Sequence, residues 1–362
     1  MEKRGQIDAI LPHTLLLALI RERNTLIYKD IYPGIVSVAI ICWHMNCSIY
    51  KCHGNELTYY LLTYPAGRSP HLPVLFFTLI SFFPISGFSI YNVIPLLFLT
   101  DFLNMKAKFH FLGTGTSIGT PMIGCSCKVC KSENPRNKRL RCSAVIVFEN
   151  GLNILIDAST DLRQQALHHN INRLDAVLLT HHHADHIFGL DDLRVYNYHQ
   201  NESIPVYTPK KSLAEVKKVY SYAFTSQPPK GGFLRMELIP VWSESFEIKG
   251  INIVPVPVNH GEIKILGYRI GNLAYLTDVS AIPEKSLKLL RELGILILSA
   301  LRYKPHPKHL NVDQAVETAK RIGAERTYFT HISHWVEHTE MEKVLPEGMK
   351  PAYDGLITEF DL

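Results

Sequence analysis

The segment 178–186 has the residue types and the spacing most suited to chemistry in this chain. It reads Leu-Leu-Thr-His-His-His-Ala-Asp-His, so an apolar stretch leads into the pattern His-x-His-x-Asp-His. Alternate residues of a strand point to the same side, and His181 and His183 can therefore bind one cation together. After the following turn, Asp185 and His186 would present a second pair of ligands. Imidazole and carboxylate groups suit zinc, manganese or iron, and two such ions can hold a hydroxide and an oxyanion between them.

Three more side chains that could bind a metal stand at the ends of apolar, strand-like segments: His260, Asp278 and His331. The ends of strands meet at one rim of a sheet, where loops leave room for a substrate. With four ligands already expected at 181–186, this position favours ligation over an isolated packed or surface histidine. His182 points to the other side of its strand and is not assigned.

We expect these side chains to form a centre with two metal ions. The first ion would be held by His181, His183 and His260, the second by Asp185, His186 and His331, and Asp278 would bridge the two. A hydroxide held between the ions would be the nucleophile, because bound water is much more acidic than bulk water. Asp157, at the end of another strand-like segment, would either orient a ligating histidine or cap a turn.

A second metal-binding group is indicated by Cys125, Cys127 and Cys130, three thiols within six residues. This spacing is typical of a structural zinc site rather than of a disulfide framework, and His334 is the best candidate for the fourth ligand. A redox-active or reactive cysteine cluster is the alternative. Cys142 is expected to pack as a small apolar residue.

The elements that must position these residues are short strands with helices between them. Strand-like segments rich in Val, Ile, Leu, Phe and Tyr are found at 108–112, 144–148, 153–157, 176–180, 204–208, 251–258, 265–270, 273–277, 295–299 and 327–330. Helical periodicity is found at 161–168, 212–223, 283–293 and 312–322. Asn311 or Asp313 could cap the last of these helices. This order predicts two sheets covered by helices on their outer faces.

The chain of 362 residues divides near Met105. The run 72–100 has no formal charge and is long enough to span a bilayer, although Pro84 and Pro95 interrupt it. Residues 1–104 have three interpretations: a membrane anchor, a poorly folded appendage, or upstream sequence translated from too early a start codon. The third is favoured, because Met105 leads directly into a strong first strand. Residues 105–362 would then form the functional domain.

The composition is that of a folded protein in a reducing compartment. Hydrophobic residues make up 46% of the chain, and the net charge of +5 does not by itself call for a nucleic acid. The seven cysteines show no disulfide ladder, which predicts a cytoplasmic location. Membrane association would follow only if residues 1–104 belong to the natural protein.

These residues resemble the metallo-β-lactamase superfamily, whose His-x-His-x-Asp-His motif binds two metals in an αββα sandwich. Within it the chain most resembles the PhnP-like phosphodiesterases of the carbon–phosphorus lyase pathway, which hydrolyse phosphoribosyl cyclic phosphate. The resemblance runs from about Met105 to the C-terminus. The matching segments are 111–116, the cysteine cluster, 141–143, 155–158, the histidine motif, 330–334 and 353–355.

The resemblance implies an α/β fold of the αββα type and a metal-dependent phosphodiesterase. Its cofactors would be two catalytic divalent ions, zinc or manganese, and one structural zinc on the three cysteines and His334. Its substrate would be a small-molecule phosphodiester such as phosphoribosyl 1,2-cyclic phosphate, attacked by metal-bound hydroxide. Asp185 would be catalytic as a metal ligand. A histidine that contacts phosphate or acts as an acid maps to His309, with His306 the weaker choice.

Other functions fit the same motif, since a fold does not fix the substrate. One is a transfer-RNA 3′-processing endonuclease, in which the basic run 131–141 would contact RNA phosphates, although the cysteine cluster speaks against it. Thioester or lactam hydrolysis is another. A non-catalytic relative from pyrroloquinoline quinone biosynthesis is a third, and the intact histidine motif favours hydrolysis over it. A homodimer stays an open alternative for the assembly.

Overall fold

The computed structural model describes residues 105–225 and 234–362 in full and, before them, the backbone of five strands. These strands are β1 Ala18–Glu22, β2 Thr25–Tyr32, β3 Ile35–Cys42, β4 Cys47–His53 and β5 Glu56–Leu62. The first three form one antiparallel sheet, and β4 pairs with β5 in another. The run 72–100, for which a membrane anchor was one hypothesis, lies outside the described residues. In the described part of the chain, no helix has the length and hydropathy needed to cross a membrane.

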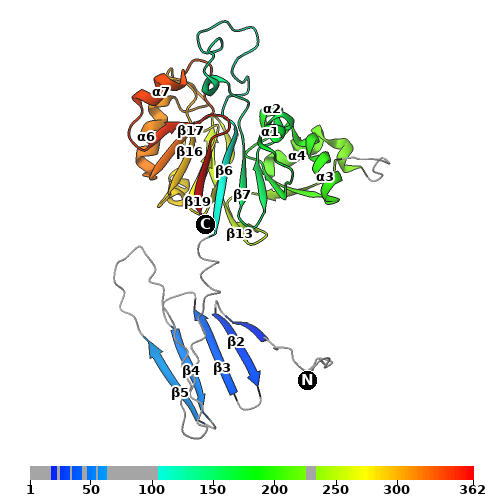
Figure 1. Ribbon diagram of the computed structural model, residues 1–362, viewed down its shortest axis with the longest axis vertical. Coiled ribbons are helices and arrows are strands. Elements are labelled where there is room, and N and C mark those ends of the chain that lie inside the picture. The colour runs from blue at the N-terminus through cyan, green and yellow to red at the C-terminus, as the bar shows by residue number, and fades with distance from the viewer. Residues whose placement is uncertain are drawn as a thin grey trace. The chain divides into compact units, whose positions relative to one another are not determined.

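Two seven-stranded sheets form the layers of the larger compact unit, Pro95–Leu362 (Figure 1). The first sheet has the order β11-β10-β9-β8-β7-β6-β19. Its strands are β6 Lys106–Gly113, β7 Ser143–Phe148, β8 Asn153–Ile156, β9 Ala176–Leu178, β10 Ile204–Pro209, β11 Met236–Val241 and β19 Ile357–Asp361. The second has the order β12-β13-β14-β15-β16-β17-β18. Its strands are β12 Phe246–Ile248, β13 Ile251–His260, β14 Ile263–Ile270, β15 Leu273–Leu276, β16 Ile295–Ser299, β17 Arg326–Thr330 and β18 Met349–Pro351.

The inner faces of the two sheets pack against each other. Phe109 on β6 and Tyr275 on β15 are almost completely buried, with ring centroids 5.7 Å apart. They belong to one continuous apolar cluster that draws on strands of both sheets. Burial of such side chains stabilises the sandwich by roughly 25 cal/mol for each Å² of apolar surface removed from water.

Helices cover the outer face of each sheet (Figure 1). The first sheet is covered by helices between residues 162 and 219, and their apolar side chains join a cluster with those of β7, β8 and β10. These helices are α1 Leu162–His169, α2 Ala184–Ile187, α3 Leu193–Gln200 and α4 Lys210–Val219. The second sheet is covered by α5 Glu284–Leu287, α6 Val312–Ile322 and α7 His338–Val344. The predicted pair of sheets with helices outside is therefore confirmed.

Helix α6 has the bounds that the sequence predicts, because both of its ends are marked chemically. Asn311 accepts a hydrogen bond from the Gln314 backbone at 2.8 Å, and the Gln314 side chain accepts one from the Asn311 backbone at 3.0 Å. This reciprocal pair is a capping box. Gly323 ends the helix with a φ of 75°, which lies in the left-handed region that glycine adopts easily.

The helix predicted at 283–293 is wrong in its length. The structure has one α-turn, α5, followed by the short 3-10 turn Lys288–Leu290. Arg291 is extended and Glu292 has a φ of 57°, so the chain turns early towards β16. Leu290, one of the apolar residues whose spacing suggested a long helix, is buried from the 3-10 turn instead.

Four strands of the sandwich were not predicted: β11, β12, β18 and β19. β19 has alternating exposed and buried residues and contains two acidic side chains, so its apolar content is low for a strand. It pairs antiparallel with β6 and brings the end of the chain beside the first strand of the unit (Figure 1). Long-range pairing of this kind leaves little trace in local sequence.

Candidate metal centre

Three candidate site residues lie just beyond parallel strands and have an unusual backbone. Asp157 follows β8, Asp278 follows β15 and His331 follows β17, and their φ angles are 60°, 56° and 56°. Residues other than glycine rarely adopt positive φ, and such strain costs about 1–3 kcal/mol for each residue where it persists. The strain is concentrated where the chain must turn sharply and still aim a side chain across the rim of the sandwich.

The first proposed set of ligands is brought together by the segment after β9 and the end of β13. Nε2 of His181 lies 2.8 Å from Nδ1 of His183, and the ring of His260 lies 5.5 and 5.2 Å from these two rings. One ligand atom from each of the three residues lies within 4.8 Å of the others. Nδ1 of His260 is 2.9 Å from the backbone oxygen of Lys308, so Nδ1 donates and Nε2 is left to face the site.

The second proposed set is arranged around Asp278. Nε2 of His186 lies 3.3 Å from a carboxylate oxygen of Asp185 and 3.3 Å from Oδ2 of Asp278. Nε2 of His331 lies 3.2 Å from Oδ1 of Asp278. Both oxygens of Asp278 thus face histidines that are assigned to the second ion.

The two sets overlap, because Asp278 is also close to His181 and His260 of the first set. Ligand atoms of His181, His186 and Asp278 lie within 4.8 Å of one another, and so do those of His260, Asp278 and His309. All seven side chains assigned from the sequence therefore meet in one place. His182 does not join them: its Nδ1 lies 3.0 Å from Oγ of Ser212.

Burial and neighbouring charges shift the pKa values of the buried carboxylate and imidazole groups of the site. Burial alone would raise the pKa of Asp278, but His331 and His186 hold it well below its usual value. Burial alone would lower the pKa of His186, but Asp157 and Asp278 raise it well above its usual value. Burial lowers the pKa of His181 far below its usual value, so its ring nitrogen is available as an electron-pair donor.

The residues present fit divalent metal ions. Nε2 of His186 and both ring nitrogens of His331 are buried without a well-formed hydrogen bond, and the close nitrogen pair of His181 and His183 needs a shared proton or cation. Imidazole nitrogens and carboxylate oxygens are the ligands that zinc and manganese accept. A cation at this position would satisfy these atoms together.

Asp157 takes the orienting role rather than that of a cap. Its Oδ2 lies 2.7 Å from Nδ1 of His186, and both side chains are completely buried. It also accepts hydrogen bonds from the backbone and the hydroxyl of Thr180, each at 2.8 Å. These contacts hold the His186 ring so that Nε2 faces the site.

His309 lies inside this group of residues, and His306 lies farther out. The His309 ring stacks on His331 with centroids 4.9 Å apart, lies 4.7 Å from His260, and places Nδ1 3.7 Å from Oδ1 of Asp278. Burial lowers the pKa of His309 to about 3, so the ring is neutral at pH 7. A neutral imidazole can donate one N–H to an acceptor such as a phosphoryl oxygen. The ring of His306 is 5.0 Å from that of His309.

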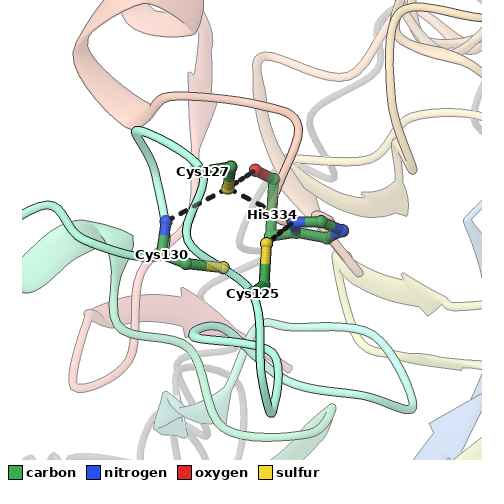
Figure 2. A group of neighbouring side chains, drawn as sticks. All are labelled: Cys125, Cys127, Cys130 and His334. Carbon is green, nitrogen blue, oxygen red and sulfur yellow. Dashed lines mark hydrogen bonds between the residues drawn. The ribbon is translucent and has the colours of Figure 1, made fainter.

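The cysteine cluster is a second, separate site (Figure 2). Sγ of Cys125 and Sγ of Cys127 lie 3.5 and 3.4 Å from Nδ1 of His334, and Cys130 completes a set of four ligand atoms within 4.8 Å. A hydrogen bond from the Cys130 backbone lowers the pKa of the Cys127 thiol to about 6, whereas burial raises the pKa of Cys130 to about 11. Three sulfurs and one imidazole nitrogen are a donor set that fits structural zinc.

One short segment links the two sites. His331 belongs to the rim of the sandwich and His334 to the cysteine cluster, three residues later. Between them, the backbone nitrogen of Ile332 donates to the Thr114 oxygen at 2.9 Å. The cysteine cluster and the rim of the sandwich are therefore connected by a segment that carries a candidate ligand of each, His334 and His331.

Part of the basic run 131–141 makes contacts within the protein itself. Arg139 is 3% exposed and donates to the Thr114 hydroxyl at 2.7 Å and to the Ala352 oxygen at 2.6 Å. Arg141 forms an ion pair with Asp161 at 2.8 Å. Two of the cations that the RNA-binding hypothesis needs are thus occupied within the protein.

Sequence reasoning missed several residues that support the site. The orienting acceptor for His260 is a backbone oxygen, that of Lys308, so no side-chain signal could have revealed it. Asp354 accepts from the Thr114 and Leu140 backbones at 2.9 and 2.6 Å and joins the end of β6 to the basic run. Burial raises the pKa of Asp354 to about 6. The only signal for Asp354 was its place in a segment matched by resemblance.

The fold and the site together define a class of protein, and comparisons with known families agree. The family model described as "Beta-lactamase superfamily domain" matches residues 152–332. The chain belongs to this superfamily and has the metallo-β-lactamase fold.

Individual relatives share the same region of the chain. The crystal structure of a new diphosphatase from the PhnP family is 44% identical, with a TM-score of 0.68, and the match covers 72% of this chain and 99% of that one. The octanoyltransferase of Porphyromonas gingivalis is 40% identical over 248 residues, which are 68% of this chain and 50% of that protein. Ribonuclease Z of Bacillus thuringiensis is 29% identical over 171 residues, 45% of this chain and 48% of that protein. The chain thus spans about half the length of these two curated relatives. Family membership and the PhnP-family structure support a hydrolase.

Proposed function

We propose that this protein is a hydrolase that uses two divalent metal ions to cleave phosphodiesters. The observation that carries this proposal is the position of Asp278. Its carboxylate lies 3.3 and 3.2 Å from Nε2 of His186 and His331 in the second set, and within 4.8 Å of ligand atoms of His181 and His260 in the first. Paired ions in such a site supply a water of low pKa and positive charge for the phosphoryl oxygens when they are bound.

The chain's own residues have distinct roles in this proposal. His181, His183 and His260 would hold the first ion, Asp185, His186 and His331 the second, and Asp278 both. Asp157 fixes the ring of His186, and the Lys308 oxygen fixes the ring of His260. His309 would donate a hydrogen bond to the phosphate and keep it in line with the nucleophile.

The substrate that we favour is a small cyclic phosphate such as phosphoribosyl 1,2-cyclic phosphate. Support comes from the PhnP-family structure, which this chain covers almost from end to end. That same structure is called a diphosphatase, and this favours a diphosphate as the second candidate. Both reactions displace an oxygen from phosphorus, so one site could serve either.

Two other activities receive less support. For RNA processing, the basic run would have to contact phosphates, but Arg139 is buried and Arg141 is paired with Asp161. For acyl transfer, the octanoyltransferase match covers only half of that protein, so its named activity need not belong to the shared half.

The proposal is tested by a substrate screen with the full chain loaded with manganese or zinc. Cyclic phosphates, aryl phosphodiesters, diphosphates, a thioester and a precursor transfer RNA would be compared at equal concentration. We expect cyclic phosphates and aryl phosphodiesters to be cleaved, and an Asp278→Asn variant to be inactive. An Arg321→Gln variant, which changes an exposed ion pair with Glu284, is the matched control. Turnover of only the thioester or the transfer RNA would refute the proposal.

A further inference from the structure

The loop 302–309 carries two groups that the site depends on. His309 contacts His331 and approaches Asp278, and the backbone oxygen of Lys308 accepts the hydrogen bond that orients His260. Both groups are displaced if the loop changes shape. Whatever fixes this loop therefore controls the orientation of a proposed metal ligand and the position of the phosphate-contacting histidine.

The loop itself has little packing to hold it. Residues 303, 304, 305, 307 and 308 are exposed, and the prolines at 305 and 307 have no N–H to donate. Its base is closed by a hydrogen bond from the Leu301 backbone to Leu310 at 3.1 Å and by one from the Asn311 amide to Tyr303 at 3.1 Å. These bonds close the ends of the loop but do not shape its tip.

The tip is shaped by His306, whose Nδ1 accepts from the Lys308 backbone at 3.2 Å, and by Arg302. Nε of Arg302 donates to the Lys304 oxygen at 3.1 Å, and its Nη2 donates to the Pro305 oxygen at 3.0 Å. The planar guanidinium thus holds the loop by donating to the carbonyl groups of two consecutive residues. A lysine has three N–H donors on one nitrogen but lacks the rigid planar fork that directs Nε–H and Nη–H to two separate carbonyl groups.

Trp335 holds the guanidinium in this position. The Arg302 Cζ lies 5.1 Å from the centroid of the Trp335 ring, within the range of a cation–π contact. The indole also neighbours the ring of His334, with centroids 4.6 Å apart. Trp335 is 57% exposed, so burial in the core does not explain a residue of this size here.

We propose that Trp335 and Arg302 are positioning residues that connect the cysteine site to the metal centre. The path runs from His334 through Trp335 and Arg302 to the loop 302–309, and from there to His260 and His309. This inference rests on the proposed function, since it assigns a role within the same site. It concerns the orientation of groups and not contact with the substrate.

The test compares four variants of the full chain: Arg302→Lys, Arg302→Gln, Trp335→Ala and Trp335→Phe. Arg321→Gln is the matched control, because it also removes an exposed arginine from an ion pair. Five quantities are measured for each protein. They are Mn²⁺ affinity from the electron paramagnetic resonance signal of the free ion, zinc content, melting temperature, and kcat and KM for bis(p-nitrophenyl) phosphate.

We expect both Arg302 variants and Trp335→Ala to bind Mn²⁺ roughly 10- to 100-fold more weakly, as is usual when a group that orients a metal ligand is lost. Their kcat should fall, while zinc content and melting temperature stay near those of the control. Trp335→Phe should recover most of the Mn²⁺ affinity, because it keeps an aromatic face under the guanidinium.

The inference is overturned if Arg302→Lys and Arg302→Gln bind Mn²⁺ as tightly as Arg321→Gln. It is also overturned if every loss follows a lower melting temperature, since that would indicate general destabilisation. These outcomes do not depend on whether the proposed function is correct. If the wild-type chain cleaves no phosphodiester but Mn²⁺ affinity still depends on Arg302, the proposed reaction is wrong and the positioning role stands.

Discussion

Oδ2 of Asp157 lies 2.7 Å from Nδ1 of His186, and neither side chain has any exposed surface. Asp157 is held in turn by the backbone and hydroxyl of Thr180. This pair decides which nitrogen of His186 faces Asp185 and Asp278. The strained φ of 60° at Asp157 is therefore tied to the orientation of one proposed metal ligand.

The first prediction concerns this pair. Asp157→Asn should weaken metal binding by roughly 10- to 100-fold, because the amide cannot fix the His186 tautomer as the carboxylate does. The measurement is Mn²⁺ affinity of the full chain. Asp313→Asn, an exposed change in the first turn of α6, is the control and should bind like the wild type. Equal affinities for the two variants would show that Asp157 does not orient a ligand.

The second prediction concerns the cysteine site. Cys127→Ser should lose one equivalent of zinc and lower the melting temperature by roughly 10 °C or more, because structural zinc supplies folding free energy. Cys142→Ser is the comparison, since Cys142 is a buried thiol outside the set of four ligands. It should keep its zinc. Full zinc content and an unchanged melting temperature in Cys127→Ser would refute the assignment.

The third prediction separates His309 from the metal ligands. His309→Ala should keep its metals and lose roughly a hundredfold or more in turnover of an alkyl phosphodiester. If His309 helps the leaving group depart, the loss should be smaller for nitrophenyl esters, whose leaving group needs no proton. If it only binds phosphate, the loss should be similar for both substrates.

A parallel variant, His306→Ala, tests the weaker choice of histidine. The His306 ring lies beside His309 on the outer side of the loop, so a modest effect is expected. Wild-type rates for His309→Ala on both classes of ester would remove His309 from the proposed machinery and leave the metal site intact.

The fourth prediction is that residues 1–104 are dispensable for catalysis. All candidate ligands lie after Met105, within the compact unit Pro95–Leu362. A protein that begins at Met105 should therefore match the full chain in kcat within about twofold, since all transition-state contacts are retained. A folded but inactive protein of this length would show that the preceding residues contribute to the site.

The sequence placed the candidate ligands in one group because strand ends and ligand types coincide. His260 is the last residue of β13, and Asp278 and His331 lie just beyond β15 and β17. Parallel strands bring such positions to one rim, so local pattern was enough to group them. The predicted division of these ligands between two ions stays a prediction.

Other features could not be predicted because they depend on tertiary contacts. The Lys308 oxygen that orients His260 belongs to a surface loop, and its side chain carries no signal. β19 was missed because only its pairing with β6 makes it a strand. In the sequence, Arg139 is one cation of a basic run. In the structure it is buried against Thr114 and Ala352 in the interior.

The central claim is that Asp278 and the ligands around it hold two divalent ions. Metal analysis of the gently purified, active full chain tests this most directly, alongside Asp278→Asn. We expect about two catalytic ions in addition to one structural zinc in the wild type, which is the usual count for a paired site. The variant should lose catalytic metal and activity together and keep its structural zinc. A fully active wild-type protein with a single catalytic ion would contradict the account.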